Sequence, residues 1–128
     1  MFNRRFTAVG AIVFFFAIGT VGFAGSPMVR VQPHAELDES GLGIVVHVIL
    51  DCGDGGTIFG GLAVGARQGD FADGNVDGIA DEGRHEQEVF IPGPFVPGDA
   101  VASASLSCGA GLLLEAQDLG RPISIAEP

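Results

Sequence analysis

The chain has 128 residues, and its 6 Lys and Arg residues against 16 Asp and Glu residues give a formal net charge of −10. Its hydrophobic fraction of 47% is too high for a disordered acidic tail, so one small folded domain is expected. The negative charge repels phosphate backbones and anionic lipid heads, which argues against binding to nucleic acid or to membrane surfaces.

The start of the chain has the three-part layout of a secretory signal peptide. Two arginines precede an uncharged apolar run over residues 7–23, and small residues then suit cleavage after Ala24. We therefore expect residues 1–24 to be a signal peptide, and residues 25–128 to form a single domain without stable membrane insertion, in the extracellular space or cell wall. An uncleaved transmembrane anchor is the alternative, because the run approaches the length that crosses a bilayer.

The rest of the chain alternates between apolar and other residues with a period of two, which is typical of β-strands with one buried face. The clearest alternation covers residues 44–52 and 100–108, and shorter segments lie near residues 29–31, 89–91 and 123–125. Gly and Pro interrupt the sequence too often for long helices. The pattern predicts an all-β fold, an antiparallel β-sandwich of immunoglobulin-like architecture with about seven strands.

The 2 cysteines, Cys52 and Cys108, each end a predicted strand on its apolar side. Because secretion exposes the chain to an oxidising compartment, we predict one disulfide between these two strands. In the chain-entropy model such a bridge contributes about 4 kcal/mol to stability. A metal site or catalytic thiol is disfavoured, since neither cysteine has a CxxC partner or a nearby His.

An acidic segment over residues 69–83 stands apart from the predicted strands. Its spacing D-x-N-x-D-G-x-x-D resembles the calcium loops of EF-hands, dockerins and thrombospondin-type repeats. In such loops, side-chain oxygens converge on the ion because a glycine permits a sharp turn. The resemblance implies as ligands Asp73, Asn75, Asp77, the backbone carbonyl of Ile79, Asp81 and Glu82.

The segment departs from the EF-hand pattern at the twelfth position, where Arg84 replaces a bidentate Glu. Glu82, Glu86 or Asp70 would have to complete the ligand shell, and the expected affinity is weak, about 10⁻⁴ to 10⁻³ M. The alternative interpretation is a solvated acidic hairpin loop that is shaped by its glycines.

Motifs of the common enzyme classes are absent from the sequence, including a nucleophile elbow, a phosphate-binding loop and HExxH. The 3 histidines are scattered, and we interpret His47 as a partly exposed or hydrogen-bonded strand residue rather than a catalytic base. The chain is therefore not expected to be an enzyme. The alternative is a catalytic Ser-His-Asp group that is assembled only in three dimensions.

The C-terminal part of the chain contains the sequence GPFVPGDAVASA at residues 93–104, then Cys108 and RPISI at residues 121–125. These segments resemble a pattern in small, uncharacterised secreted proteins of actinobacteria with a β-sandwich fold. The resemblance implies fold and export, and it implies no activity.

The expected function is that of a secreted, non-catalytic module that binds a protein or a cell-envelope component or has a structural role. Calcium is the one candidate cofactor, and the acidic segment is the candidate contact for a cation or a basic partner. Two alternatives are a small-ligand carrier with a cleft between sheets, and a protease inhibitor that presents the loop from Pro92 to Pro97.

Overall fold

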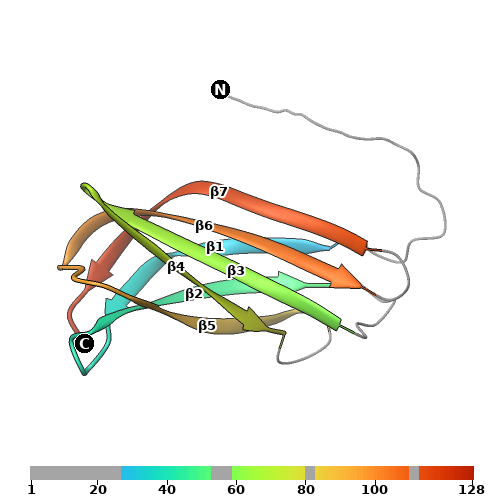
Figure 1. Cartoon of the computed structure of the whole chain (residues 1–128), viewed down its shortest axis with the longest axis horizontal. Helices are drawn as coiled ribbons and strands as arrows, with labels where there is room; N and C mark the ends of the chain where they lie inside the picture. The colour runs from blue at the N-terminus through green and yellow to red at the C-terminus, as the bar shows by residue number, and fades with distance from the viewer. Residues whose placement is uncertain (1–26, 53–58, 80–82, 110–112) are drawn as a thin grey trace.

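Seven β-strands make up the part of the protein that its computed structural model describes, residues 27–52, 59–79, 83–109 and 113–128 (Figure 1). The predicted signal peptide, residues 1–24, lies outside these ranges. No helix in the described ranges is long and apolar enough to cross a membrane. The strands are β1 (Met28–Leu37), β2 (Gly43–Asp51), β3 (Phe59–Gln68), β4 (Phe71–Gly78), β5 (His85–Pro92), β6 (Gly98–Gly109) and β7 (Leu113–Ala126). The all-β prediction is confirmed.

The strands pair in one sheet with the order β4-β3-β6-β7-β1-β2-β5. Every pair is antiparallel except β1 and β7, which run parallel where His34 lies beside Ser124. The sheet is therefore mixed, and it curls over so that β1, β2 and β5 face the other four strands in a nearly closed barrel (Figure 1). The predicted immunoglobulin-like pair of antiparallel sheets is not confirmed, because β1 pairs with both β2 and β7 and joins all strands.

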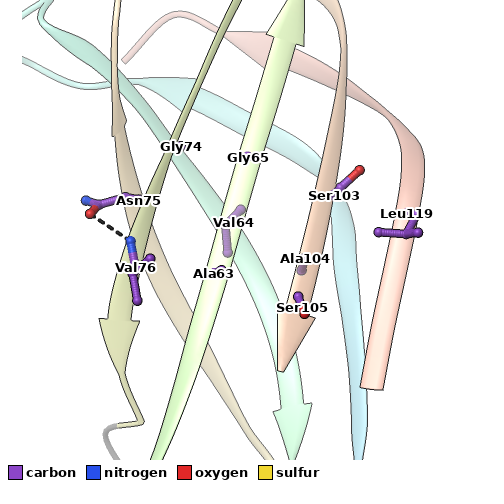
Figure 2. Close-up of a pocket in the computed structure, with 10 residues that line it drawn as sticks. All are labelled: Ala63, Val64, Gly65, Gly74, Asn75, Val76, Ser103, Ala104, Ser105 and Leu119. Carbon is purple, nitrogen blue, oxygen red and sulfur yellow. Dashed lines mark hydrogen bonds between the residues drawn. The ribbon is translucent and has the colours of Figure 1, made fainter. Parts of the chain in front are cut away.

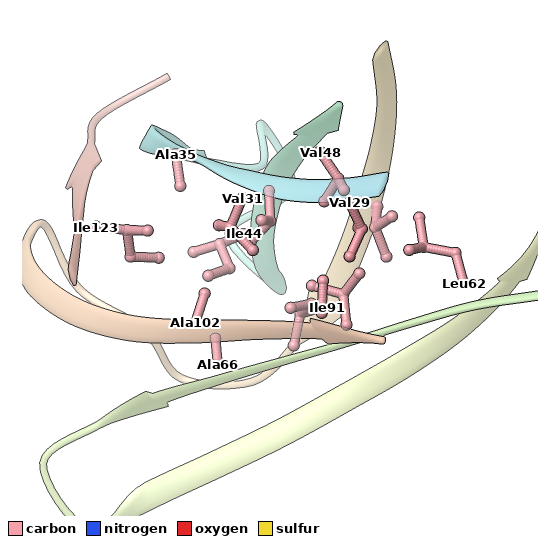
Figure 3. Close-up of a cluster of buried hydrophobic side chains, with 14 of the residues drawn as sticks. Val29, Val31, Ala35, Ile44, Val48, Leu62, Ala66, Ile91, Ala102 and Ile123 are labelled. Atoms are coloured by element: carbon pink, nitrogen blue, oxygen red, sulfur yellow. The ribbon is translucent and has the colours of Figure 1, made fainter. Parts of the chain in front are cut away.

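The space between the two halves is filled by the inward-facing side chains of alternate residues, as the period-two pattern predicts (Figure 3). The buried side chains of β2 are large, whereas most of those of β6 are small, and this difference lets the two halves pack closely. The residues concerned are Ile44, Val46, Val48 and Leu50 on β2, and Ala100, Ala102, Ala104 and Leu106 on β6.

The predicted disulfide between Cys52 and Cys108 is present, with an S–S distance of 2.01 Å and a Cα–Cα distance of 5.7 Å. Cys52 directly follows β2, and Cys108 lies near the end of β6. Both cysteines are buried among the core side chains. The bridge therefore connects the two facing halves of the sheet across the core.

Asp118 on β7 connects the two halves at a second place. One of its carboxylate oxygens accepts a hydrogen bond from the backbone N–H of Val31 at 2.8 Å, and the other accepts one from Arg121 Nε at 2.6 Å. The register between β6 and β7 shifts at this point, where Gly120 has a φ of 67° and donates its N–H to Ser103 Oγ. A buried carboxylate therefore holds β1 against β7 next to the irregular turn of β7.

The two edge strands, β4 and β5, meet along a seam that side chains bridge. Asn75 Nδ2 donates a hydrogen bond to the carbonyl oxygen of Phe90 at 2.8 Å, and Gln87 Nε2 donates one to that of Gly78 at 2.8 Å. No pairing between β4 and β5 joins the sheet edges in the described residues. The amide bridges occupy backbone groups that an exposed sheet edge would offer to another chain.

Candidate functional site

The segment that resembles a calcium loop forms strand β4 from Phe71 to Gly78, which corrects the predicted loop conformation. Asp73, Asn75 and Asp77 lie opposite alternate residues of β3 and therefore share one face of the strand. In an extended strand such positions are about 6.7 Å apart, and the first and third are about 13 Å apart. The described part of the segment is thus stretched out rather than wrapped around a centre.

Two of the predicted ligands already make hydrogen bonds within the protein. Asn75 Oδ1 accepts the N–H of Val76 at 2.8 Å, while its amide nitrogen bridges the seam. Asp73 Oδ1 accepts the N–H of Gly74 at 2.7 Å. These contacts hold both side chains along the strand and direct Asn75 toward β5.

The remaining predicted ligands follow β4 in the sequence. Ile79 is partly buried against the core, while Asp81 and Glu82 lie outside the described residues. Within the described ranges, no group of three or more His, Cys, Asp or Glu side chains is arranged to hold a metal ion. Calcium binding therefore stays a prediction.

Gly74 shows why an Asp- and Gly-rich stretch forms a strand here. A Cβ atom at this position would lie 2.9 Å from the carbonyl oxygen of Val64 on β3, which is closer than side chains tolerate. The glycine thus permits close approach of β4 to β3, rather than the sharp turn that the calcium-loop pattern suggests.

Both strands that form the seam carry acidic residues. Asp77 on β4 and Glu88 on β5 lie in sequence between the residues that make the two amide bridges. Asp73 precedes these residues on β4, and Glu86 precedes them on β5. We call Asp73, Asp77, Glu86 and Glu88 the acidic band. The fold therefore brings the predicted acidic segment next to two further carboxylates of the following strand.

His47 lies at the centre of a second group of charges, on the outer face of β1, β2 and β5. Its Nε2 atom is 2.9 Å from the carboxylate of Glu36 on β1, and its Nδ1 atom is 2.9 Å from Glu86 Oε2 on β5. Glu88 Oε2 is 3.7 Å from the same Nδ1 atom. The His47 side chain is only 18% exposed. Because both ring nitrogens face acceptors, the protonated imidazolium fits this site best.

The same contacts set the pKa of His47. Burial alone would lower it, but the hydrogen bond and charge of Glu36, together with Glu86 and Glu88, outweigh burial and raise the pKa above its usual value. The sequence placed His47 on the outward face of its strand, but no pattern identified its partners. They come from β1 and β5, and only the pairing of those strands with β2 brings them together.

The opposite outer face, formed by β4, β3, β6 and β7, has a hollow of about 600 Å³ (Figure 2). Small outward residues such as Ala63, Gly65 and Ser105 form its floor, while Val76 and Leu119 stand at its two sides. We call this surface the neutral face, because every residue that lines the hollow is uncharged.

The loop before β6 is anchored at two points. Phe95 is buried and packs edge-on against Phe71, with ring centroids 5.1 Å apart. The side-chain amide of Gln68 accepts the N–H of Val96 at 2.9 Å and donates to the carbonyl oxygen of Val96 at 2.9 Å. The Val96 side chain is exposed, but both of its backbone polar groups are occupied.

Comparisons with known proteins give no assignment. No protein-family model matches the chain, and neither a curated protein nor a solved structure matches it. The proposals below therefore depend on the sequence and on the arrangement of the described residues.

Proposed function

We propose that the protein is a secreted, non-catalytic module that binds a protein or cell-envelope component, or has a structural role, and that its contact surface is the acidic band. The observation that carries this proposal is the bridging of β4 to β5, two strands that each carry two of these carboxylates. Seven of the 16 acidic residues lie between Asp70 and Glu88. Such a local concentration of negative charge attracts cations and basic partners.

Secretion is supported by the signal-peptide layout of residues 1–24 and by the disulfide, which is compatible with an extracellular location. The N-terminal residue of protein collected from culture medium, determined by mass spectrometry, tests this part. Cleavage after Ala24 is the expected result, and a cell-bound protein that retains residues 1–24 would contradict it.

The proposed architecture is an immunoglobulin-like sandwich whose halves are joined by β1. Its support is the disulfide between the end of the second strand and the sixth strand, since the corresponding strands carry the inter-sheet disulfide of immunoglobulin domains. The parallel contact of β1 with β7, beside its antiparallel contact with β2, is what closes the two halves into one sheet.

A non-catalytic role is supported by the surroundings of His47. Its two nitrogens face carboxylates on an outer surface, and neither hydrogen bond joins it to a hydroxyl or thiol nucleophile. The arrangement resembles an ion-pair cluster that connects three strands more than it resembles a base beside a nucleophile.

Calcium is proposed as the stabilising ion because four aspartates and Glu82 fall within residues 70–82 and repel one another at low salt. Melting curves recorded at increasing calcium, with magnesium as the control ion, test this. A rise of several degrees at millimolar calcium is expected, and the double substitution Asp73→Asn and Asp77→Asn should abolish it. An unchanged melting temperature would remove calcium from the proposal.

The contact with a basic partner is tested with a lysine-rich peptide as the probe, by calorimetry at low and high salt. The full chain should bind it at low salt and release it at high salt. Asp77→Asn combined with Glu88→Gln should weaken binding several-fold, whereas Glu115→Gln, on β7, is the matched control. Equal binding by both variants would contradict the band as the contact surface.

The two alternative functions have less support. The loop from Pro92 to Pro97 offers a protease an exposed Val96 side chain, but Gln68 already occupies the backbone groups that a protease would pair with. A carrier function would require a ligand site, and the hollow of the neutral face is open on an outer surface. Protease-inhibition and apolar-dye assays test these alternatives.

A further inference from the structure

Three of the five exposed large hydrophobic side chains of the described residues lie on the neutral face. Val76, Val101 and Leu119 lie there with exposed fractions of 71%, 42% and 64%. The other two, Leu42 and Val96, lie in connections between strands and are 69% and 57% exposed. Apolar side chains gathered on one face are typical of an interaction surface.

The outward-facing residues of the neutral face form four rows, because the strands are in antiparallel register. The first row is Ala72, Arg67, Val101 and Pro122; the second is Gly74, Gly65 and Ser103; the third is Val76, Ala63, Ser105 and Gln117; the fourth is Gly78, Gly61, Ser107 and Glu115. Leu119 lies beside the second row, on the β7 side of the hollow (Figure 2).

Only two residues of these rows are charged, Arg67 in the first row and Glu115 in the fourth. Their charges cancel, and Asp99 lies just beyond the first row. Two copies of a chain with a net charge of −10 repel each other. The repulsion is weakest where the neutral faces meet.

We propose that the neutral face binds the same face of a second copy, about a two-fold axis that runs across the strands. This rotation exchanges the first row with the fourth and the second row with the third. Val76 then lies opposite the partner's Gly74, and Val101 lies opposite the partner's Ser107. Large side chains thus meet small ones in each half of the interface, as a self-complementary interface requires.

The same axis brings opposite charges to the same ends of the interface. Arg67 of one copy lies at the end that holds the partner's Glu115, and the reverse holds at the other end. A two-fold axis parallel to the strands would instead bring the two copies of Arg67 to one end. Charge complementarity therefore selects the axis across the strands.

The area of the face indicates a weak dimer. Four strands about 4.8 Å apart and four rows about 6.7 Å apart cover about 500 Å² on each copy. The total of about 1,000 Å² lies at the lower limit for specific interfaces, so a dissociation constant of about 10⁻⁵ to 10⁻³ M is expected.

Analytical ultracentrifugation of the protein as it is produced tests the proposal. This protein includes residues 1–24 unless secretion removes them. The average mass should rise from one chain toward two over this concentration range. Mass that stays at one chain up to about 10⁻³ M would overturn the proposal.

Matched substitutions locate the interface. Val76→Glu and Leu119→Glu should each weaken association at least tenfold, whereas Val96→Glu and Leu42→Glu place the same charge on similarly exposed residues and should leave it unchanged. An unchanged melting curve confirms that each variant is folded. Equal effects of all four substitutions, or no effect of the first two, would overturn the proposal.

A charge exchange tests the axis. Arg67→Glu and Glu115→Arg should each weaken association severalfold, and the double variant should recover most of the loss because opposite charges again lie at the same end of the interface. A double variant no better than the single ones would overturn the axis across the strands. None of these outcomes depends on the acidic band, so the proposed function is tested independently.

Discussion

The two outer faces of the curled sheet cover the same core but differ in chemistry. The face of β1, β2 and β5 carries His47, and the carboxylates of Glu36, Glu86 and Glu88 all contact its ring nitrogens. The neutral face carries mostly Gly, Ala and Ser, so its backbone lies close to the surface. The inward side chains of both halves are buried in the same core. The two halves therefore differ in the chemistry of their outward side chains.

The difference indicates that charge is distributed by face rather than by strand. Asp73 and Asp77 share a face of β4 with Asn75, which bonds across the seam, while the outward positions Gly74 and Val76 belong to the neutral face. One strand thus contributes to both surfaces, because successive side chains point to opposite sides. Both faces depend on the contacts that hold the two halves of the sheet together, which are the disulfide and the hydrogen bonds of Asp118.

The largest effect is expected when the covalent connection between the halves is removed. Replacing Cys52 and Cys108 by Ala should lower the free energy of unfolding by about 4 kcal/mol, since the unfolded chain regains the freedom that the bridge removes. Urea unfolding monitored by circular dichroism measures the loss. A loss below about 1 kcal/mol would mean that noncovalent contacts alone hold the two faces together.

A smaller loss is expected at the second connection between the halves. Asp118→Ala should cost about 2–3 kcal/mol, because the buried N–H of Val31 loses its acceptor and Arg121 loses its partner. Glu115→Ala, at an exposed position of the same strand, is the control and should change stability by less than about 0.5 kcal/mol. Similar effects of the two substitutions in urea unfolding would contradict the role of Asp118.

The smallest effect concerns only the outer face of β1, β2 and β5, and it depends on pH. Because the folded protein raises the pKa of His47, the stabilisation is complete below the unfolded value of about 6.5 and is lost as pH rises through the raised folded value. His47→Gln should therefore cost about 1 kcal/mol at pH 6 and less at pH 9.

Urea unfolding at both pH values measures this difference, and His34→Gln, at an exposed position on β1, is the control. A cost for His47→Gln that grows with pH would contradict the imidazolium interpretation. Association through the neutral face should be the same in this variant as in the unsubstituted chain.

Sequence patterns predicted well where the alternation of residues reports a buried face. The segments that end at Cys52 and Cys108 have the predicted inward residues, and their disulfide is formed. The prediction failed for β4, whose Asp and Gly residues are typical of loops. This strand lies at the sheet edge, where hydrogen bonds with β3 and close approach at Gly74 favour the extended conformation.

The His47 site was beyond sequence reasoning for a different reason. Glu36 is 11 positions from His47 in the chain and Glu86 is 39 positions away. Nothing in the spacing of these residues indicates that β1 and β5 flank β2. The mixed sheet was missed in the same way, because the parallel contact of β1 with β7 joins the two ends of the described chain.

The sequence by itself determined the strands with a clear apolar face, the residues that form the core, the cysteine pair and the excess of negative charge. These features depend on backbone geometry and composition, which act over a few residues. The tertiary structure alone decided which strands are neighbours, and thereby where carboxylates surround His47, where they form a band and where the surface is neutral. Strand pairing depends on hydrogen bonds between distant segments, and many pairings share the same local pattern.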